Sequence, residues 1–440
     1  MPKVFLCVDP GGSQTKIIYQ LPRDKKPKYL LMPPEVEQIK EDNLKRYLEK
    51  ESSMSNPSAI RQAYLEVKER TFVVGYFASK FDPEDRLFEI KYENALYKTL
   101  AAIGVIAEFN NLNPKKILLH LAILLPWNEY TDRKKFQNQL TEYLSNFVFR
   151  GQSYSVQIDK FICRPEGGGL ATIHSKKKGK QWKQDKKLGI LMCGHRNLTL
   201  LNLEYGELTG DSPLIGFSLF LDDVITRTSG LNRDRIASAI FEGLESEARN
   251  NRQLSRLEFF RSAQRRSHPD WCKLSAISKL VNAKEQNLRA QEIADVSNAI
   301  ALAGAEYWLK VSKYLERNFP EDLDEIIVSG GASRFLESYL EKHYNCKLKI
   351  ARVDNEDLKY RTREYEPLDP NKHFVPIVWG AGSVEEITNI LDLQGEKEAQ
   401  ESLSYRLVDV FGVFDLLLSK NQKKPKKTTS KTTNQETTVS

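Results

Sequence analysis

The sequence has few cysteines and no pair of them at the spacing of a disulfide or zinc motif. Its five cysteines in 440 residues are odd in number and widely spaced, and none forms a CxxC pair. A disulfide-stabilised scaffold and a zinc ribbon are therefore excluded. We expect a protein of a reducing compartment and assign it to the cytoplasm.

Long hydrophobic runs are also missing. No apolar stretch approaches the roughly 20 residues that span a bilayer as a helix. Asp9 interrupts the apolar start of the chain, which leaves too short a run for a signal peptide. Hydrophobic residues still make up 40% of the chain, enough for globular domains with buried cores.

Positive charge is scarce outside two short segments. The net charge is +7, but residues 420–440 carry +5 and residues 176–187 carry +6, so the rest of the chain carries −4. A body that reads DNA sequence in a groove is usually basic, so we expect no direct sequence-specific DNA binding. The Lys-rich tail, residues 419–440, is predicted to be disordered and to meet any anionic surface.

Two segments repeat the pattern of a strand, a glycine turn and a strand. The first lies at residues 3–20 and the second at residues 188–204. Gly194 follows Gly11 by 183 positions, which suggests two halves built on one plan by internal duplication. Predicted strands and helices alternate along the chain, so the fold class is α/β.

Hydrophobic periodicity predicts the remaining elements. Residues 21–57 are expected to form loops with one helix at 41–50. We expect a hairpin at 63–74, strands at 117–125 and 324–328, and helices at 92–109, from Asn128 through Phe147, and at 213–227, 293–318, 334–343 and 383–393. The predicted domains are domain I (1–175, completed by 376–418), a basic insertion (176–187), domain II (188–375) and the tail.

Three glycine-rich turns follow predicted strands, and none is a Walker loop or a GxGxxG helix start. They comprise residues 9–13, 194–197 and 329–333. Glycine lets the backbone approach a phosphate closely and direct amide groups at it. An ordinary hairpin turn also uses glycine, and for any single loop that is the better interpretation. Three such loops after strands favour a nucleotide site.

Side chains beside the first turn suit the same anion. Ser13, Thr15 and Lys16 offer two hydroxyl groups and an ammonium group. Asp9, at the end of the preceding strand, can hold the hydration shell of a divalent cation that bridges phosphates.

The order of several motifs resembles the actin superfamily, in particular its ParM/StbA-like plasmid segregation branch. The matching segments are 8–16 (first phosphate hairpin), 72–78 (VGxxA element), 124–126 (GLP strand end), 164–169 (connecting turn), 194–199 (second phosphate hairpin) and 326–333 (adenosine motif). The resemblance implies an actin-like two-domain α/β fold of duplicated ribonuclease-H-like domains, with a nucleotide in the cleft between them.

The resemblance also implies roles for individual residues. Asp9 would hold Mg²⁺ through water, and Glu166 would position or activate the water that attacks ATP or GTP; the alternative for Glu166 is a helix-start acid favoured by the dipole. Arg196 would offset phosphate charge, or it is simply a turn arginine. The residues expected to contact the nucleotide are Gly11, Gly12, Ser13, Thr15, Lys16, Gly194, Arg196, Gly330 and Gly331.

One position departs from the family pattern. The second hairpin of the family reads Asp-x-Gly, whereas this chain has Met192-Cys193-Gly194. The second carboxylate on the metal side is missing, so we expect slow or absent hydrolysis.

The segment 405–418 is apolar and precedes a run of lysines. An apolar helix followed by a polybasic stretch can attach to an anionic membrane. The alternative is a last helix packed on the body or on a neighbouring subunit. Asp409 and Asp415 favour the packed helix, because they lie within the apolar run.

Together these features predict an actin-like protein that self-associates into ATP-dependent filaments. Plasmid DNA, reached through a DNA-binding adaptor, is the candidate cargo. Two alternatives stay open: a nucleotide-binding scaffold of the same fold that does not hydrolyse, and a membrane-attached actin relative.

Overall fold

The computed structural model describes residues 2–52, 57–81, 91–179, 181, 184–250, 276–351, 362–395 and 397–420. The predicted disordered tail from residue 421 onward lies outside the described residues, as do positions 180, 182 and 183 of the basic insertion.

The first half is built on a five-stranded sheet of order β3-β2-β1-β7-β10. Its strands are β1 (Lys3–Pro10), β2 (Thr15–Gln20), β3 (Lys28–Met32), β7 (Ile117–Leu125) and β10 (Val156–Pro165). β1 runs antiparallel to β2 and parallel to β7, which in turn is parallel to β10. β7 is almost wholly apolar because alternate residues face two separate cores, one on each side of the sheet.

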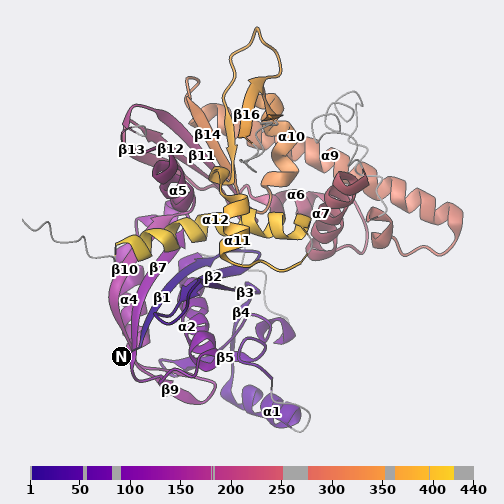
Figure 1. Cartoon of the computed structure of the whole chain (residues 1–440). Coiled ribbons are helices and arrows are strands. Elements are labelled where there is room, and N and C mark those ends of the chain that lie inside the picture. Colours follow the sequence, from indigo (N-terminus) through magenta and orange to yellow (C-terminus); the bar gives the residue numbers. More distant parts are fainter. Residues whose placement is uncertain are drawn as a thin grey trace, which may run out of the picture.

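The second half repeats this plan strand for strand (Figure 1). Its sheet has the order β13-β12-β11-β14-β17, with β11 antiparallel to β12 and parallel to β14. The strands are β11 (Lys187–Cys193), β12 (Leu198–Glu204), β13 (Glu207–Asp211), β14 (Glu325–Ser329) and β17 (Ile377–Trp379). Equal strand order and equal strand directions confirm the predicted duplication.

Smaller sheets and the helices complete the two halves. The first half carries a sheet of order β4-β6-β5-β8-β9, and the second carries the hairpin β15-β16. These strands are β4 (Val36–Ile39), β5 (Ala63–Val67), β6 (Arg70–Val74), β8 (Phe147–Phe149), β9 (Gln152–Tyr154), β15 (Cys346–Ala351) and β16 (Thr362–Pro367). The α-helices of the first half are α1 (Glu41–Ser52), α2 (Lys91–Phe109), α3 (Trp127–Tyr130), α4 (Arg133–Ser145) and α5 (Gly168–Lys178). Those that follow are α6 (Phe217–Thr226), α7 (Arg233–Asn250), α9 (Gln286–Asn318), α10 (Ser333–His343), α11 (Val384–Ile390) and α12 (Lys397–Ser419).

Most predicted elements are confirmed, and two exceptions have local causes. Residues 21–57 contain the strands β3 and β4 besides the predicted helix. These strands were not predicted, because strands of five and four residues are too short to show a clear period. The helix expected to start at Asn128 is wrong. Asn128 lies inside the short α3, and α4 begins only at Arg133, so Phe147 falls into β8.

The C-terminal helix α12 crosses the molecule between the two halves (Figure 1). Its apolar side chains are buried in a core shared with both sheets: Leu407, Val408, Val410, Val413, Phe414 and Leu417. These side chains are covered by protein, so residues 405–418 form the predicted packed helix and not a membrane-binding helix. None of the described helices combines the length and hydropathy that a membrane crossing requires.

Two glycines bring α12 against α5. A Cβ atom on Gly169 of α5 would lie 1.9 Å from the backbone oxygen of Asp409, and one on Gly412 of α12 would lie 2.2 Å from the backbone oxygen of Gly169. Only glycine fits at these two positions, because the helices touch backbone to backbone.

We expect Gly169→Ala to lower the free energy of unfolding by about 1–3 kcal/mol, because the added methyl group forces the two helices apart. Gly304→Ala is the matched control. Gly304 also lies inside a helix, but its added Cβ would meet nothing closer than 3.6 Å, so alanine should be neutral or stabilise by about 0.5–1 kcal/mol. Urea unfolding of both variants tests this. An equal loss of unfolding free energy in the two variants would contradict the close contact between α5 and α12.

Candidate functional site

The first glycine loop, residues 11–14, joins β1 to β2. Asp9 pairs across the hairpin with Lys16, and the Lys16 Nζ lies 2.5 Å from the Asp9 Oδ2. A Cβ atom on Gly11 would lie 2.6 Å from the backbone oxygen of Gln14, so the tight turn requires glycine there. The predicted residues Gly12 and Ser13 lie at the more accessible tip of the loop.

The second loop has the same length and the same register. Residues 194–197 join β11 to β12, and Met192 pairs with Thr199 where the first hairpin pairs Asp9 with Lys16. Met192 is buried, with its Cγ 3.4 Å from the Cβ position of Gly167. The position of the missing acid is therefore part of an apolar contact between the two halves.

The third loop, residues 329–333, forms hydrogen bonds with the end of β11 and with α12. The Ala332 N–H donates to the Cys193 carbonyl oxygen over 3.0 Å, beside the second loop. The Ser329 hydroxyl donates to the Tyr405 carbonyl oxygen of α12 over 2.8 Å. Gly330 has a φ of +103°, and a Cβ atom there would lie 2.4 Å from the Cys193 oxygen, so only glycine fits.

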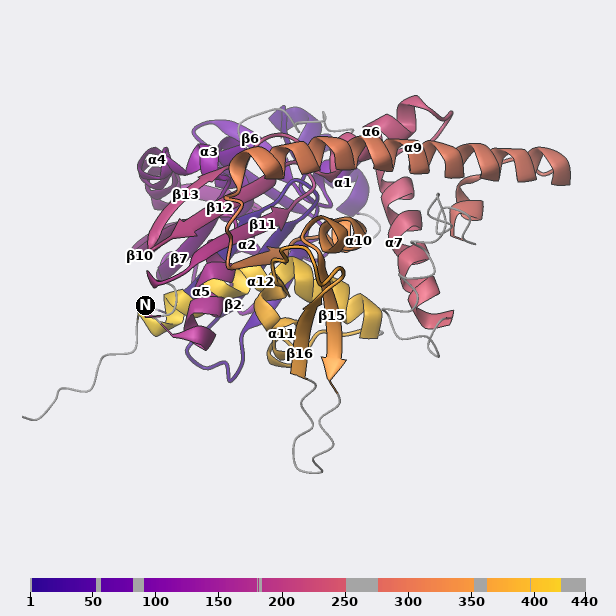
Figure 2. The ribbon, with the colours of Figure 1, turned by 90° about the horizontal axis from the view of Figure 1, so that it is seen from above.

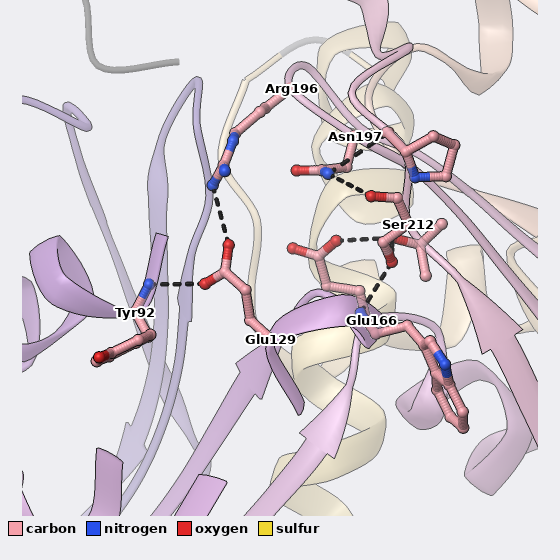
Figure 3. A network of polar contacts seen from close by, with 9 residues as sticks. Tyr92, Glu129, Glu166, Arg196, Asn197 and Ser212 are labelled. Carbon is pink, nitrogen blue, oxygen red and sulfur yellow. Dashed lines mark hydrogen bonds and ion pairs between the residues drawn. The ribbon is translucent and has the colours of Figure 1, made fainter. Parts of the chain in front are cut away.

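Glu166 reaches from the first half to the second (Figure 3). Its Oε2 accepts a hydrogen bond of 3.0 Å from the Thr199 hydroxyl, which lies 2.8 Å from the Ser212 hydroxyl. Ser212 Oγ also accepts from the backbone N–H of Trp127. Glu166 is thus the start of a polar chain that crosses between the halves twice. It lies just before α5, as the helix-start alternative expected, but its carboxylate is partly buried and hydrogen-bonded to the second half.

Arg196 of the second loop points toward Glu129 of the first half (Figure 3). Its Nη1 lies 3.3 Å from the Glu129 Oε1. The other oxygen of Glu129 accepts from the Tyr92 N–H at the start of α2 over 2.8 Å. Arg196 therefore forms an ion pair between the halves, with a carboxylate that sequence reasoning missed.

Arg406 of α12 is a second residue that sequence reasoning missed. Its Nη2 donates to the Gln14 Oε1 of the first loop over 2.7 Å. Its stem packs beside the third loop, because a Cβ atom on Gly331 would lie 3.7 Å from the Arg406 Cγ. Arg406 thereby connects the first and third loops.

Asp409, one turn further along α12, holds the turn that carries Glu166. Its Oδ2 accepts from the Gly167 N–H over 2.7 Å, and its Oδ1 accepts from the N–H groups of Gly169 and Leu170 over 2.7 and 3.2 Å. Asp409 thus caps the N-terminus of α5 from another helix. Burial raises the pKa of Asp409 to about 7, against the lowering effect of these hydrogen bonds.

This donor set fits a polyphosphate. Lys16 and Arg406 supply positive charge, and the Thr15 hydroxyl is buried without a hydrogen-bond partner among the described residues. No group of three metal-ligating side chains occurs in the described part of the chain. Mg²⁺ commonly binds through one or two carboxylates, several waters and substrate phosphates, so Asp9 suits a magnesium ion that arrives with a nucleotide.

Comparisons with known proteins identify the fold. No protein-family model and no curated protein matches the sequence. The crystal structure of the actin-like protein Alp7A matches with a TM-score of 0.50 and 12% identity, over 95% of this chain and 97% of that chain. An archaeal actin homologue, Ta0583, gives 0.49 and 13% over 96% and 100%, and Bacillus thuringiensis ParM with ATP gives 0.47 and 9% over 95% and 100%. The chain has the actin-like two-domain fold that its motif order predicted.

We expect the stability contributed by Asp409 to fall as the pH rises from about 4 to about 7. Its folded pKa of about 7 exceeds the ordinary 3.8, so in this range the folded protein binds the proton more tightly than the unfolded chain does. Melting temperatures of the wild type and of Asp409→Asn, measured from pH 5 to pH 8, test this. The wild type should lose stability relative to the variant as the pH rises, and a relative gain would contradict the raised pKa.

Proposed function

We propose that this protein is an actin-like protein that binds ATP with Mg²⁺ between its two halves and assembles into filaments. The observation that carries the proposal is that three glycine-rich loops are linked to one another. Arg406 joins the first loop to the third, and the Ala332–Cys193 hydrogen bond joins the third loop to the start of the second. Domain I (1–175 with 376–418) and domain II (188–375) would enclose the nucleotide.

The proposed contacts follow the chemistry of each group. Backbone amides and side chains of Gly11, Gly12, Ser13, Thr15 and Lys16 would bind phosphates, as would Gly194 from the second half. Gly330 and Gly331 would lie by the ribose and the α-phosphate. Asp9 would hold Mg²⁺ through water, where the ion offsets phosphate charge.

A non-hydrolysing scaffold of the same fold is the second candidate, and a specific observation favours it. Met192, at the register position of Asp9, is buried in apolar contacts and offers no oxygen ligand to Mg²⁺. In the hydrolysing alternative, Glu166 would orient the attacking water, with the Thr199 hydroxyl holding its carboxylate.

Two exposed leucines of α9, a helix that extends well beyond the body (Figure 2), are candidate contacts for self-association. Leu302 and Leu309 are seven residues apart and each is 53% exposed, so they lie near one face of the helix. Exposed apolar patches commonly mark protein contacts.

The proposal also includes three partners or settings of the protein. These are a DNA-binding adaptor, an anionic surface that the Lys-rich tail would meet, and a cytoplasmic location.

ATP with Mg²⁺ is expected to raise the melting temperature, because a ligand that binds only the folded state stabilises it by about 2.7 kcal/mol at a hundred times its Kd. Gly331→Glu should abolish the shift, since the new carboxylate would lie beside Arg406 and repel phosphates. Gly206→Glu is the control for the added charge, because nothing lies within 4 Å of its Cβ position. Its φ of +91° strains any side chain, so the ATP-dependent shift is compared and not the basal melting temperature. An unchanged melting curve of the wild type with saturating ATP and with saturating GTP would refute nucleotide binding.

Filament formation predicts that the protein pellets in an ultracentrifuge with ATP and much less with ADP or without nucleotide. Leu302→Glu combined with Leu309→Glu should reduce the pellet severalfold, because a buried unpaired carboxylate opposes association. Leu214→Glu is a control on another exposed leucine, which is 42% exposed. Pelleting that is independent of nucleotide would argue against an actin-like assembly.

Phosphate release separates the two candidates. We expect a slow wild type, a faster Met192→Asp variant in which the added carboxylate holds the metal more firmly, and a still slower Glu166→Gln variant that binds ATP normally. A wild type that hydrolyses ATP rapidly and is slowed by Met192→Asp would contradict this account of the second hairpin.

A further inference from the structure

Arg406 is held among the glycine loops although no phosphate motif includes it. It lies on α12, 392 residues after its hydrogen-bond partner Gln14. Its own neighbour Tyr405 accepts a hydrogen bond from the Gly330 N–H through its carbonyl oxygen, over 3.3 Å. The third loop and the first loop thus both contact this one turn of α12.

The charge of Arg406 is poorly compensated. Among the described residues its hydrogen bond goes to a neutral amide, and no carboxylate lies within ion-pair distance of it. Burial lowers the pKa of its guanidinium, and only the more distant charge of Asp9 opposes that effect. A guanidinium has five N–H donors, and a desolvated cation without an anion is costly.

Two other cationic side chains of these loops, unlike Arg406, have a carboxylate partner. Lys16 pairs with Asp9, and Arg196 pairs with Glu129. Both therefore have a carboxylate in this structure, whereas Arg406 has only Gln14. The uncompensated positive charge lies between the first and third loops.

We propose that Arg406 is a phosphate-binding residue, which contacts the phosphate groups of the nucleotide from the side of α12. The inference rests on the proposed nucleotide site and adds a residue to it. A guanidinium binds phosphate oxygens in a bidentate manner, and Gln14 is a neutral partner that it can leave at little cost. Since Asp409 lies one turn further on the same helix, the contact would connect phosphate binding to the turn that carries Glu166.

The test compares ligands with and without phosphates. Calorimetric titration with Mg²⁺ and ATP, ADP or adenosine is carried out on the wild type, Arg406→Gln and Arg406→Lys. We expect Arg406→Gln to weaken ATP binding about tenfold to a hundredfold, the usual effect of losing charge-assisted hydrogen bonds, and to change adenosine binding less than twofold. Arg406→Lys, which keeps the charge without the fork, should give an intermediate affinity.

Arg150→Gln is the matched control. Arg150, like Arg406, is partly buried. Unlike Arg406 it has a carboxylate partner, with its Nη1 3.0 Å from the Glu108 Oε2, and it belongs to the β8-β9 turn, away from the loops. Its loss should leave ATP affinity unchanged.

The outcomes distinguish this inference from the function on which it rests. A wild type that does not bind ATP overturns both. A wild type that binds ATP, with Arg406→Gln equally tight or equally weakened toward ATP and adenosine, overturns only the role of Arg406. Should Arg406→Gln fail to fold, phenylglyoxal modification of the wild type replaces it: ATP must protect Arg406 and adenosine must not, and modification that ATP does not slow overturns the inference.

Discussion

The carboxylate of Asp409 holds the N-terminus of α5 where the two halves of the molecule meet. It accepts three backbone N–H groups from the turn at residues 167–170, which no residue within that turn caps. Burying a carboxylate costs several kcal/mol unless it is well paired, so these donors and the helix dipole together make the arrangement tolerable. The raised pKa of Asp409 shows that burial still dominates.

This one interaction sets the position of α12, and several parts of the site depend on that position. Gly169 and Gly412 allow the backbone contact that brings Asp409 to the turn. The preceding turn of α12 then lies where Tyr405 accepts from the third loop and Arg406 donates to the first. A helix built for packing thus also holds two of the glycine loops.

The repeated hairpins show how duplication can diverge in chemistry while its geometry is kept. Both hairpins have a four-residue loop and the same register, but Asp9 and Lys16 of the first correspond to Met192 and Thr199 of the second. The first pair is charged and suits a metal-bound phosphate. The second is an apolar residue and a hydroxyl, and the hydroxyl donates to Glu166 instead. At this register position the charged pair is therefore in the first half. Glu129 and Glu166 of that half form polar contacts with the second half.

The sequence by itself determined the features that rest on local chemistry. Glycine turns between short apolar strands predicted both hairpins, a continuous apolar run predicted β7, and the acids inside 405–418 pointed to a packed helix. The order of the individually degenerate motifs was enough to predict the fold. The strands β3 and β4 were missed because they are too short to show a clear period, and the start of α4 was missed because its first three residues are charged.

Only the tertiary structure decided which distant side chains join the site. Asp409 caps a turn 242 residues earlier in the chain, and Arg406 contacts Gln14 across 392 residues. Nothing in the spacing of a helix shows which of its polar residues will be buried against another element. Likewise, the ion pair between Arg196 and Glu129 depends on how the two halves pack against each other. Such contacts are set by the close packing of whole elements, which local sequence does not encode.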